Sequence, residues 1–313
     1  MGIKHLNKYL IEKCKSIKKI HIKKFRNKKI VIDTSIYIYK FLSENALIER
    51  MYKMIKMFQE YNITPIFIFD GKPPPEKKEL LIRRNQLKYQ AQEKYNELIS
   101  QNSGNESELQ NLKNQFLKIS ETHINQVKDL FKAMGVKYFV STTESDPICV
   151  YLVNSNKVCG CLTEDMDMFV YGCHHILRNI DIDTHEIQYY NIHSILKELN
   201  VTYLDFKQIL VLSGTDYNIQ STTNLYKTLA LFDRYKSSYF YNRMTFYEWL
   251  KQCNSYYIKD RDKLNHCYEM FDLCYYMNEL ESFITLNEKD LSMSPPNIDT
   301  LTQLSQLYGF CVA

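Results

Sequence analysis

The sequence predicts an α/β protein with a central, mostly parallel sheet flanked by helices. Short apolar runs rich in Ile, Val and Phe alternate along the chain with longer segments of helical periodicity. Strands and helices that alternate in this way form parallel sheets that are covered on both faces. Of the 313 residues, 45% are hydrophobic, which is enough apolar material for a sizeable core.

The first half of the chain supplies two strands and the longest helices. A short buried strand at 30–32 passes at Asp33 into an amphipathic helix, and residues 46–62 have a helical period. A second strand, TPIFIF, ends at a Gly-Lys-Pro-Pro-Pro turn, because proline continues neither element. Residues 76–100 are polar and helix-prone, and after QNSGNES a second amphipathic helix covers about 107–134.

The second half of the chain begins with strands and ends in helices. Strands are expected at 136–140 and 157–162, and a further strand pair in HHILRNI and EIQYYNI. The Glu144 segment is expected to become helical after Pro147. Helical patterns dominate from LDFKQILVLSG onward, and SPPN at 294–297 marks a break before a short tail.

Positive charge is concentrated near the start of the sequence. The formal net charge is +4, yet residues 1–30 hold eleven lysines and arginines against a single acid, Glu12. Such a segment suits either a solvated basic face or a polyanionic partner, and charge alone does not choose between them. The nine cysteines form no C-x-x-C pair, which indicates reduced thiols in an intracellular protein. No apolar run reaches the length of a membrane span.

Acidic residues follow the predicted strands at the points where the strands end. Asp33 follows IVI, Asp70 follows PIFIF and Asp165 follows CGCLTE. The carboxyl ends of parallel strands share one edge, where α/β proteins bind ligands, so these side chains are expected to converge. A single acid of this kind is also compatible with a helix N-cap. The predicted set has seven members: Asp33, Asp70, Glu144, Asp146, Asp165, Asp167 and Asp216.

The predicted acidic cluster requires positive charge close by. Seven unpaired carboxylates in one cleft repel each other, and divalent cations resolve that repulsion. Mg²⁺ prefers oxygen ligands, and two such ions about 4 Å apart suit phosphodiester hydrolysis. The sequence therefore predicts two Mg²⁺ ions, for which Mn²⁺ would substitute, and a hydrolytic reaction on a phosphodiester.

With these motifs in this order, the chain resembles the flap endonuclease family of structure-specific 5′ nucleases from residue 1 to about 217. MGIKHL is similar to the family's amino terminus, VIDTSIYIYKFL to its first metal-ligand segment and FIFDGKPPPEKKELLIRR to its second. ESD, TEDMD and LSGTDY supply the remaining acids. The resemblance implies a PIN-like 5′ nuclease fold in which the seven acids hold the metal ions and Asp165 also takes part in catalysis.

The resemblance also implies roles for five other residues. Lys77 would reach the scissile phosphate, with Arg84 as its partner two turns on, although both would otherwise indicate only an exposed basic helix face. Gly2 would lie near the DNA. Tyr39 would stack on the terminal base, or would simply belong to the core. Lys227 falls where the family keeps a basic residue for DNA binding.

Two regions are expected on the basis of this resemblance. Residues 1–215 would form the nuclease core, including a helical arch over about 76–134 through which the single-stranded 5′ end passes. Residues 216–313 would form a helix-two-turn-helix-like and C-terminal helical region packed on the core.

Four segments depart from the family pattern. Asp146 stands where the family commonly has Glu, and the chain between YIYKFL and RMYKMI is short, which puts a preference for a 3′ flap in doubt. The stretch NIQSTTNLYKTLALF after Asp216 contains no glycine, so a backbone contact with duplex phosphate or a monovalent cation is expected to be weakened or rebuilt. The tail LTQLSQLYGFCVA lacks the pattern of sliding-clamp ligands.

The expected activity is that of a structure-specific 5′ flap endonuclease, which cuts DNA near single-strand/double-strand junctions by two-metal catalysis. A 5′–3′ exonuclease or a Holliday-junction resolvase of the same superfamily fits the same residues. A third alternative is a non-catalytic nucleic-acid-binding protein on a nuclease fold. The expected partner is DNA with a 5′ flap, nick or branch, with no membrane and no sliding clamp. The protein is expected to be a monomer that serves DNA replication and repair, in the nucleus or, if viral, at the site of viral DNA replication.

Overall fold

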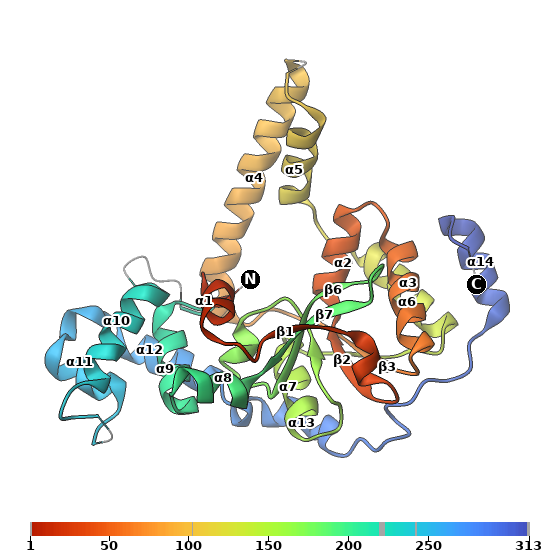
Figure 1. The fold of residues 1–313 in the computed structure, drawn as a ribbon. Coiled ribbons are helices and arrows are strands. Elements are labelled where there is room, and N and C mark those ends of the chain that lie inside the picture. The colour runs from red at the N-terminus through yellow and green to blue at the C-terminus, as the bar shows by residue number, and fades with distance from the viewer. Residues whose placement is uncertain (1, 102, 219–222, 242, 312–313) are drawn as a thin grey trace.

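The structure, a computed structural model, describes residues 2–101, 103–218, 223–241 and 243–311. A seven-stranded sheet with the order β1-β7-β6-β5-β2-β3-β4 lies at its centre (Figure 1). The strands are β1 (Lys18–His21), β2 (Lys29–Asp33), β3 (Thr64–Phe69), β4 (Lys137–Val140), β5 (Cys161–Leu162), β6 (His175–Asp181) and β7 (Glu186–Asn191). Neighbours from β6 to β4 pair in parallel, and β7 pairs antiparallel with β6 and β1, which confirms the mostly parallel sheet.

Helices cover both faces of the sheet, as Figure 1 shows. They are α1 (Leu6–Lys13), α2 (Thr34–Ser43), α3 (Leu47–Glu60), α4 (Lys78–Ser100), α5 (Glu106–Phe116), α6 (Glu121–Ala133), α7 (Asp146–Asn154), α8 (Ile192–Leu199), α9 (Tyr203–Ser213), α10 (Leu225–Lys236), α11 (Phe246–Cys253), α12 (Arg261–Met270), α13 (Met277–Ile284) and α14 (Ile298–Tyr308). The predicted α/β fold class is therefore confirmed.

Alternate residues of the central strands point to opposite faces, because side chains of a strand alternate with a period of two. In β2, Ile32 joins the hydrophobic cluster under α2, α3, α6 and α14, whereas Val31 joins the cluster under α7 and α9. In β3, Phe67 and Ile68 divide between the two clusters in the same way. Burial on both faces explains why these strands are continuous apolar runs in the sequence.

Helices α4 and α5 form a hairpin that rises from the body of the protein (Figure 1). Only Ala91 and Leu112 are buried among the described residues of these two helices. The projecting part ends at Phe116 rather than near 134, because α6 has an apolar face that includes Leu130 and Phe131 and packs on the sheet. The single helix expected over 107–134 is thus two helices.

The basic segment near the start of the chain is not a free arm. It forms α1, the strand β1 and the 3₁₀ turn η1 (Ile22–Phe25). Strand β1 has no alternation of apolar and polar residues, so its pattern did not predict it, yet it pairs with β7 and forms an edge of the sheet. Lysines on an edge strand oppose pairing with another chain.

The strand expected at 157–162 is also different from the prediction. Only Cys161–Leu162 is a strand, because residues after α7 form a turn in which Asn156 has a φ of +58°.

The C-terminal helices share a core with the first part of the chain. One hydrophobic cluster extends from Leu6 and Val31 to Trp249 and Leu280 without interruption. Helix α13 contacts α7, and α14 contacts α6 on the opposite face of the sheet. No helix in the described ranges is long and apolar enough to cross a membrane.

Candidate active site

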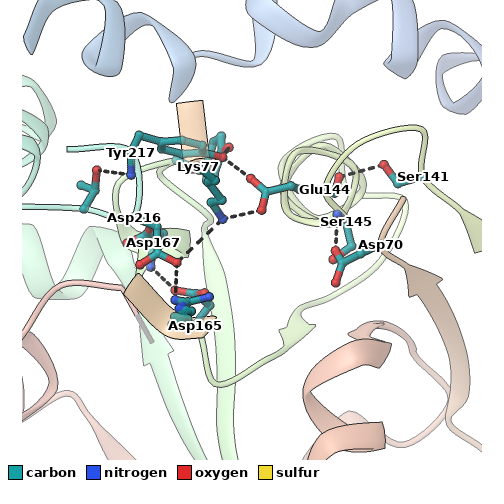
Figure 2. Close-up of polar contacts among 12 residues, drawn as sticks. Asp70, Lys77, Ser141, Glu144, Ser145, Asp165, Asp167, Asp216 and Tyr217 are labelled. Atoms are coloured by element: carbon teal, nitrogen blue, oxygen red, sulfur yellow. Dashed lines mark hydrogen bonds and ion pairs between the residues drawn. The ribbon is translucent and has the colours of Figure 1, made fainter. Parts of the chain in front are cut away.

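The predicted acids gather where β2, β3 and β5 end. Asp33 is the last residue of β2, Asp70 directly follows β3, and Asp165 lies three residues beyond β5. These strands are adjacent and parallel, so their carboxyl ends meet at one edge of the sheet. Asp146 begins α7 beside them. The acids therefore lie close together, and Asp216 pairs with Lys77 and Arg84 at the start of α4. Figure 2 shows five of them: Asp70, Glu144, Asp165, Asp167 and Asp216.

A chain of hydrogen bonds fixes the acids on the β2–β5 side. The Thr163 hydroxyl donates to Asp33 Oδ2 over 3.0 Å and accepts from the backbone N–H of Asp165 over 3.0 Å. The backbone N–H of Asp167 donates to Asp165 Oδ1 over 2.9 Å. Thr163 therefore orients the Asp33 carboxylate and fixes the backbone of Asp165, although no pattern in the sequence marks it as a site residue.

Gly2 lies against two of these carboxylates. Its φ is +71°, and a Cβ atom there would lie 2.5 Å from Asp167 Oδ1 and 2.7 Å from Asp165 Oδ1. No side chain fits in that space. The start of the chain therefore packs against Asp165 and Asp167, and a role of Gly2 near DNA stays a prediction.

Lys77 lies between Glu144 and Asp216 (Figure 2). Its ammonium donates a hydrogen bond to Glu144 and lies 3.8 Å from Asp216 Oδ2. Burial opposes the charge of Lys77, but the charges of Glu144, Asp146 and Asp216 outweigh it and raise its pKa above the usual range. Lys77 is only 7% exposed, so it is a cation held by acids rather than part of a solvated helix face.

Arg84 and Tyr217 complete this side of the cleft. Arg84 Nη2 lies 2.8 Å from Asp216 Oδ2. Lys77 is the last residue of the 3₁₀ turn η2 (Pro75–Lys77) that leads into α4, so it precedes the helix that carries Arg84. The Tyr217 hydroxyl donates to Glu144, and the Lys77 ammonium lies 4.9 Å from the centre of the Tyr217 ring. Tyr217 was not predicted as a site residue, although it stands next to Asp216 in LSGTDY.

Three of the carboxylates are destabilised as anions. Burial and the charges of nearby acids raise the pKa of Asp33, Asp146 and Asp167 well above the ordinary value of 3.8. For Asp33 the charges are those of Asp70 and Asp165, and for Asp167 they are those of Asp165 and Asp216. Raised pKa values of this kind are expected where several acids are buried close together.

The donor set fits a hard divalent cation. Asp33 Oδ1 and Asp167 Oδ1 are buried and have no hydrogen-bond partner within the described structure. Carboxylate oxygens are the ligands that Mg²⁺ and Mn²⁺ prefer, and a cation would relieve the repulsion between the acids. Among the described residues, no three acidic, histidine or cysteine side chains are arranged as a finished metal-binding group. Lys77 is instead the cation that pairs with Glu144 and Asp216 in this structure.

The remaining predicted residues lie outside the acidic cleft. Tyr39 is on α2, is 36% exposed and donates from its hydroxyl to the backbone oxygen of Asn114 in α5 over 2.6 Å. It is therefore not a core residue. Lys227 is exposed in the first turn of α10, where its N–H bonds the Asn224 side chain. Residues 219–222 of the glycine-free stretch lie outside the described residues.

Comparisons with known proteins agree with this geometry. The XPG N-terminal domain matches residues 1–91, and the XPG I-region matches residues 135–216. Flap endonuclease 1 of Bos taurus is 30% identical over 237 residues, which cover 69% of this chain and 62% of that protein. The chain thus matches less than two thirds of the length of this relative.

Solved structures share the fold over nearly the whole chain. The catalytic core of Rad2 in complex with DNA substrate has a TM-score of 0.69 at 20% identity and covers 98% of this chain and 94% of that one. Flap endonuclease-1 from Methanococcus jannaschii has a TM-score of 0.57 at 18% identity and covers 98% and 99%. Because the two XPG regions together span more than half of the sequence, this chain belongs to the FEN/XPG family of 5′ nucleases.

Proposed function

We propose that this chain is a structure-specific 5′ flap endonuclease that hydrolyses DNA phosphodiesters near single-strand/double-strand junctions with two Mg²⁺ ions. The observation that carries the proposal is the burial of repelling carboxylates around Lys77, the residue that directly precedes helix α4 of the hairpin. A protein that only binds nucleic acid has no use for such a costly arrangement of acids.

The metal ions would be held by the seven acids: Asp33, Asp70, Glu144, Asp146, Asp165, Asp167 and Asp216. The chemistry that bound Mg²⁺ supplies is a lower pKa for the attacking water and stabilisation of the charge that develops on the phosphate. Mn²⁺ has similar ligand preferences and would substitute.

The basic side chains would act on the phosphate itself. When a phosphate enters the cleft, the Lys77 ammonium exchanges part of its pairing with Glu144 for the phosphate oxygens. Arg84, which is held by Asp216 and is more exposed, contacts the same strand from the hairpin side. Both cations then offset negative charge that is greatest in the transition state. Gly2 packs directly against Asp165 and Asp167, where no larger residue fits, and would lie near the bound strand.

The surroundings of the cleft suit DNA with a free 5′ strand. Tyr39, whose hydroxyl bonds Asn114 of the hairpin helix α5, is partly exposed, so a base can stack on its ring. Lys227 and the basic segment before β2 would contact duplex phosphates. We further propose a monomer that acts on flaps, nicks or branches, at the site of DNA replication in a nucleus or a virus-infected cell. Residues 1–215 would act as the nuclease core and residues 216–313 as a duplex-binding region packed on it.

A substrate panel tests the proposal. The unaltered chain and Asp165→Asn are assayed with Mg²⁺ on 5′-labelled flap, nick, gap, blunt duplex and four-way junction DNA, and binding of the flap is measured in parallel. The expected result is fastest cleavage of the flap, lost in Asp165→Asn without a loss of binding. An anomalous scattering experiment with Mn²⁺ crystals should place two ions between Asp33, Asp70 and Asp165.

The same panel contains the outcomes that contradict the proposal. Fastest digestion of blunt or nicked duplex would indicate a 5′–3′ exonuclease, and preferential symmetrical cutting of the four-way junction would indicate a resolvase. DNA binding without cleavage of any substrate would indicate a non-catalytic binding protein. Unchanged turnover in Asp165→Asn would remove the catalytic assignment of the acids.

A further inference from the structure

Glu279, in the first turn of α13, binds the loop that precedes two of the site acids. Its carboxylate accepts hydrogen bonds from the backbone N–H groups of Thr142 over 2.7 Å and Thr143 over 3.2 Å. It also accepts from the hydroxyls of Thr142 and Thr143, each over 2.8 Å, and from the hydroxyl of Ser141. A single carboxylate thus ties down three consecutive residues, and the next residue in the chain is Glu144.

This loop connects the two halves of the acidic cleft. Its residues pair with the end of β3, since Ser141 N–H donates to Phe69 O over 2.9 Å and Gly71 N–H to Thr143 O over 2.6 Å. At its far end the Ser145 N–H donates to Asp70 Oδ1 over 2.8 Å (Figure 2). The loop therefore sets the position of Glu144 relative to Asp70.

Loop 141–143 is closely packed against the backbone that follows β3. A Cβ atom at Gly71 would lie 2.2 Å from the Ser141 carbonyl oxygen. A shift of residues 141–143 would therefore be transmitted to the Asp70 side of the cleft rather than absorbed, because packed backbone does not deform continuously.

A second route leads from the same C-terminal segment to Glu144. The Tyr276 hydroxyl lies 3.2 Å from that of Tyr171, which lies 3.4 Å from the Tyr217 hydroxyl. Tyr217 in turn donates to the Glu144 carboxylate. All three tyrosines are buried. Residues 276–279 therefore reach Glu144 from two sides, through its carboxylate and through the backbone that carries it.

Ionised carboxylate is the chemistry that suits this position. Burial alone would raise the pKa of Glu279, but the hydrogen bonds from Ser141, Thr142 and Thr143 outweigh it and hold the pKa below the usual range. All five groups are donors, so an acceptor with two anionic oxygens satisfies them together. Both backbone N–H groups donate to Oε1, whereas Oε2 accepts only from the Thr143 hydroxyl. A glutamine would remove the negative charge that strengthens these hydrogen bonds, and its amide would replace the oxygen that accepts from Thr143.

We propose that Glu279 is a positioning residue for the metal-dependent reaction. Glu279 holds loop 141–143 so that Glu144 and Asp146 face Asp70 at the distance that a divalent cation requires. The inference rests on the proposed function. It concerns residues beyond 216, where the two matched XPG regions end. Side chains that orient metal ligands without touching the metal are a recurring part of such sites.

The test compares Glu279→Gln with the control variant Glu281→Gln. Glu281 lies on the same helix, is exposed and has no hydrogen-bond partner in the described structure, so the control removes the same charge without removing a contact. Mn²⁺ affinity of the DNA-free protein is measured by calorimetry, together with the melting temperature and with kcat and KM on the flap substrate. In Glu279→Gln we expect a loss of about 10-fold in Mn²⁺ affinity and about 10- to 100-fold in kcat. KM should stay within about threefold, because the DNA contacts are unchanged. Glu281→Gln should match the unaltered chain.

A milder variant covers the case in which Glu279→Gln does not fold. Thr143→Val preserves the shape of the loop and removes one hydroxyl from the Glu279 carboxylate. It should lower Mn²⁺ affinity in the same direction by about threefold, the equivalent of one weak hydrogen bond. If Mn²⁺ affinity and kcat stay unchanged while only the melting temperature falls, Glu279 is a structural anchor and the proposal is overturned.

The calorimetric measurement separates this proposal from the proposed function. If no DNA substrate is cut but Mn²⁺ binds and Glu279→Gln weakens that binding, the positioning role stands and the nuclease assignment falls. If the flap is cut and Glu279→Gln leaves both Mn²⁺ affinity and kcat intact, the nuclease assignment stands and the positioning role of Glu279 falls. Absence of Mn²⁺ binding in the unaltered chain would overturn both.

Discussion

The cluster of acids at the ends of β2, β3 and β5, called the floor here, and the α4–α5 hairpin are built in opposite ways. The acids of the floor follow strand residues such as Ile32, Ile68 and Leu162, which are completely buried between two layers of helices. The hairpin has little buried surface of its own, and it touches the body through a few polar contacts, among them Tyr39 to Asn114 and Arg84 to Asp216. One region is fixed by the whole core, and the other by its own helix pairing and a few polar contacts with the body.

The difference follows from what each region would have to do. Carboxylates that repel each other stay together only if the backbone that carries them cannot relax, so the acids are placed at the ends of the most buried strands. A passage for a DNA strand must admit different sequences, which favours a polar hairpin with few contacts to the body. The floor therefore trades stability for function, and the hairpin does not.

The largest expected effect is on turnover at the floor. Asp33→Asn keeps the size of the side chain and the hydrogen bond from Thr163 but removes a charge from the proposed metal site. Turnover of a flap substrate in Mg²⁺ should fall by about 10³-fold, as when a preorganised charge-stabilising group is lost. Single-turnover cleavage measures it. Asp129→Asn, on the exposed face of α6, is the matched control and should cleave normally. A loss of less than tenfold would remove Asp33 from the reaction.

The two cations of the site should differ in a second, smaller effect. Lys77 is buried among three acids, whereas Arg84 is partly exposed. Lys77→Ala should lower single-turnover cleavage by about 100-fold, and Arg84→Ala by about 10-fold, because charge stabilisation is stronger away from water.

The two variants should also differ in stability. In EDTA, Lys77→Ala should melt well below the unaltered chain, because removal of one partner leaves buried charge uncompensated. Thermal melting with and without Mg²⁺ measures this, and Mg²⁺ should restore most of the loss. Lys78→Ala, at the exposed neighbouring position, is the control. Equal effects of Lys77→Ala and Arg84→Ala would contradict the difference in burial.

How far the sequence predicts this site depends on the range of the interactions. The acids at the ends of β2, β3 and β5 are predictable, because strand pattern is local and parallel strands share an edge. Strand β1 was missed, because its lysines hide the pattern and its pairing partner, β7, lies far along the chain. Tyr217 and Glu279 were missed for the same reason. Their contacts with residues 141–144 join segments more than seventy positions apart, and no local pattern marks them.

A third prediction concerns the pH dependence of the metal-free protein. The pKa values of Asp33, Asp146 and Asp167 are raised by burial and by neighbouring acids. Their favourable contribution to stability is fully present below the unfolded pKa of 3.8 and is lost as pH rises through the folded values. Asp33→Asn should therefore melt about 2–4 °C above the unaltered chain at pH 8 in EDTA, and the difference should vanish near pH 4. A variant that is less stable at pH 8 would contradict this account.

A fourth, smaller effect tests the hairpin at Tyr39. Tyr39→Phe keeps the ring and removes the hydrogen bond to Asn114, which should change turnover by less than about threefold, because exposed hydrogen bonds contribute little. Tyr39→Ala also removes the ring and should lower turnover by about tenfold if a base stacks there. Flap cleavage by both variants separates the effect of the hydrogen bond to Asn114 from the effect of the ring. Equal losses in the two variants would mean that the hydroxyl, and not the ring, is what matters.

The smallest effect is expected far from the floor, at the basic turn before β2. Lys23 and Lys24 are exposed, and neither has an ion-pair partner in the described structure. If they bind duplex phosphates, Lys23→Ala with Lys24→Ala should leave kcat unchanged and reduce the slope of log affinity against log salt by about 0.9 for each phosphate that is no longer neutralised. Titration of flap DNA between low and high salt measures this, with Lys53→Ala, whose partner is Glu49, as the control. An unchanged slope would leave these lysines as part of a solvated turn that does not contact DNA. A change in kcat would show that this turn affects the acidic cluster, and it would contradict the separation between the rigid site and its adaptable surroundings.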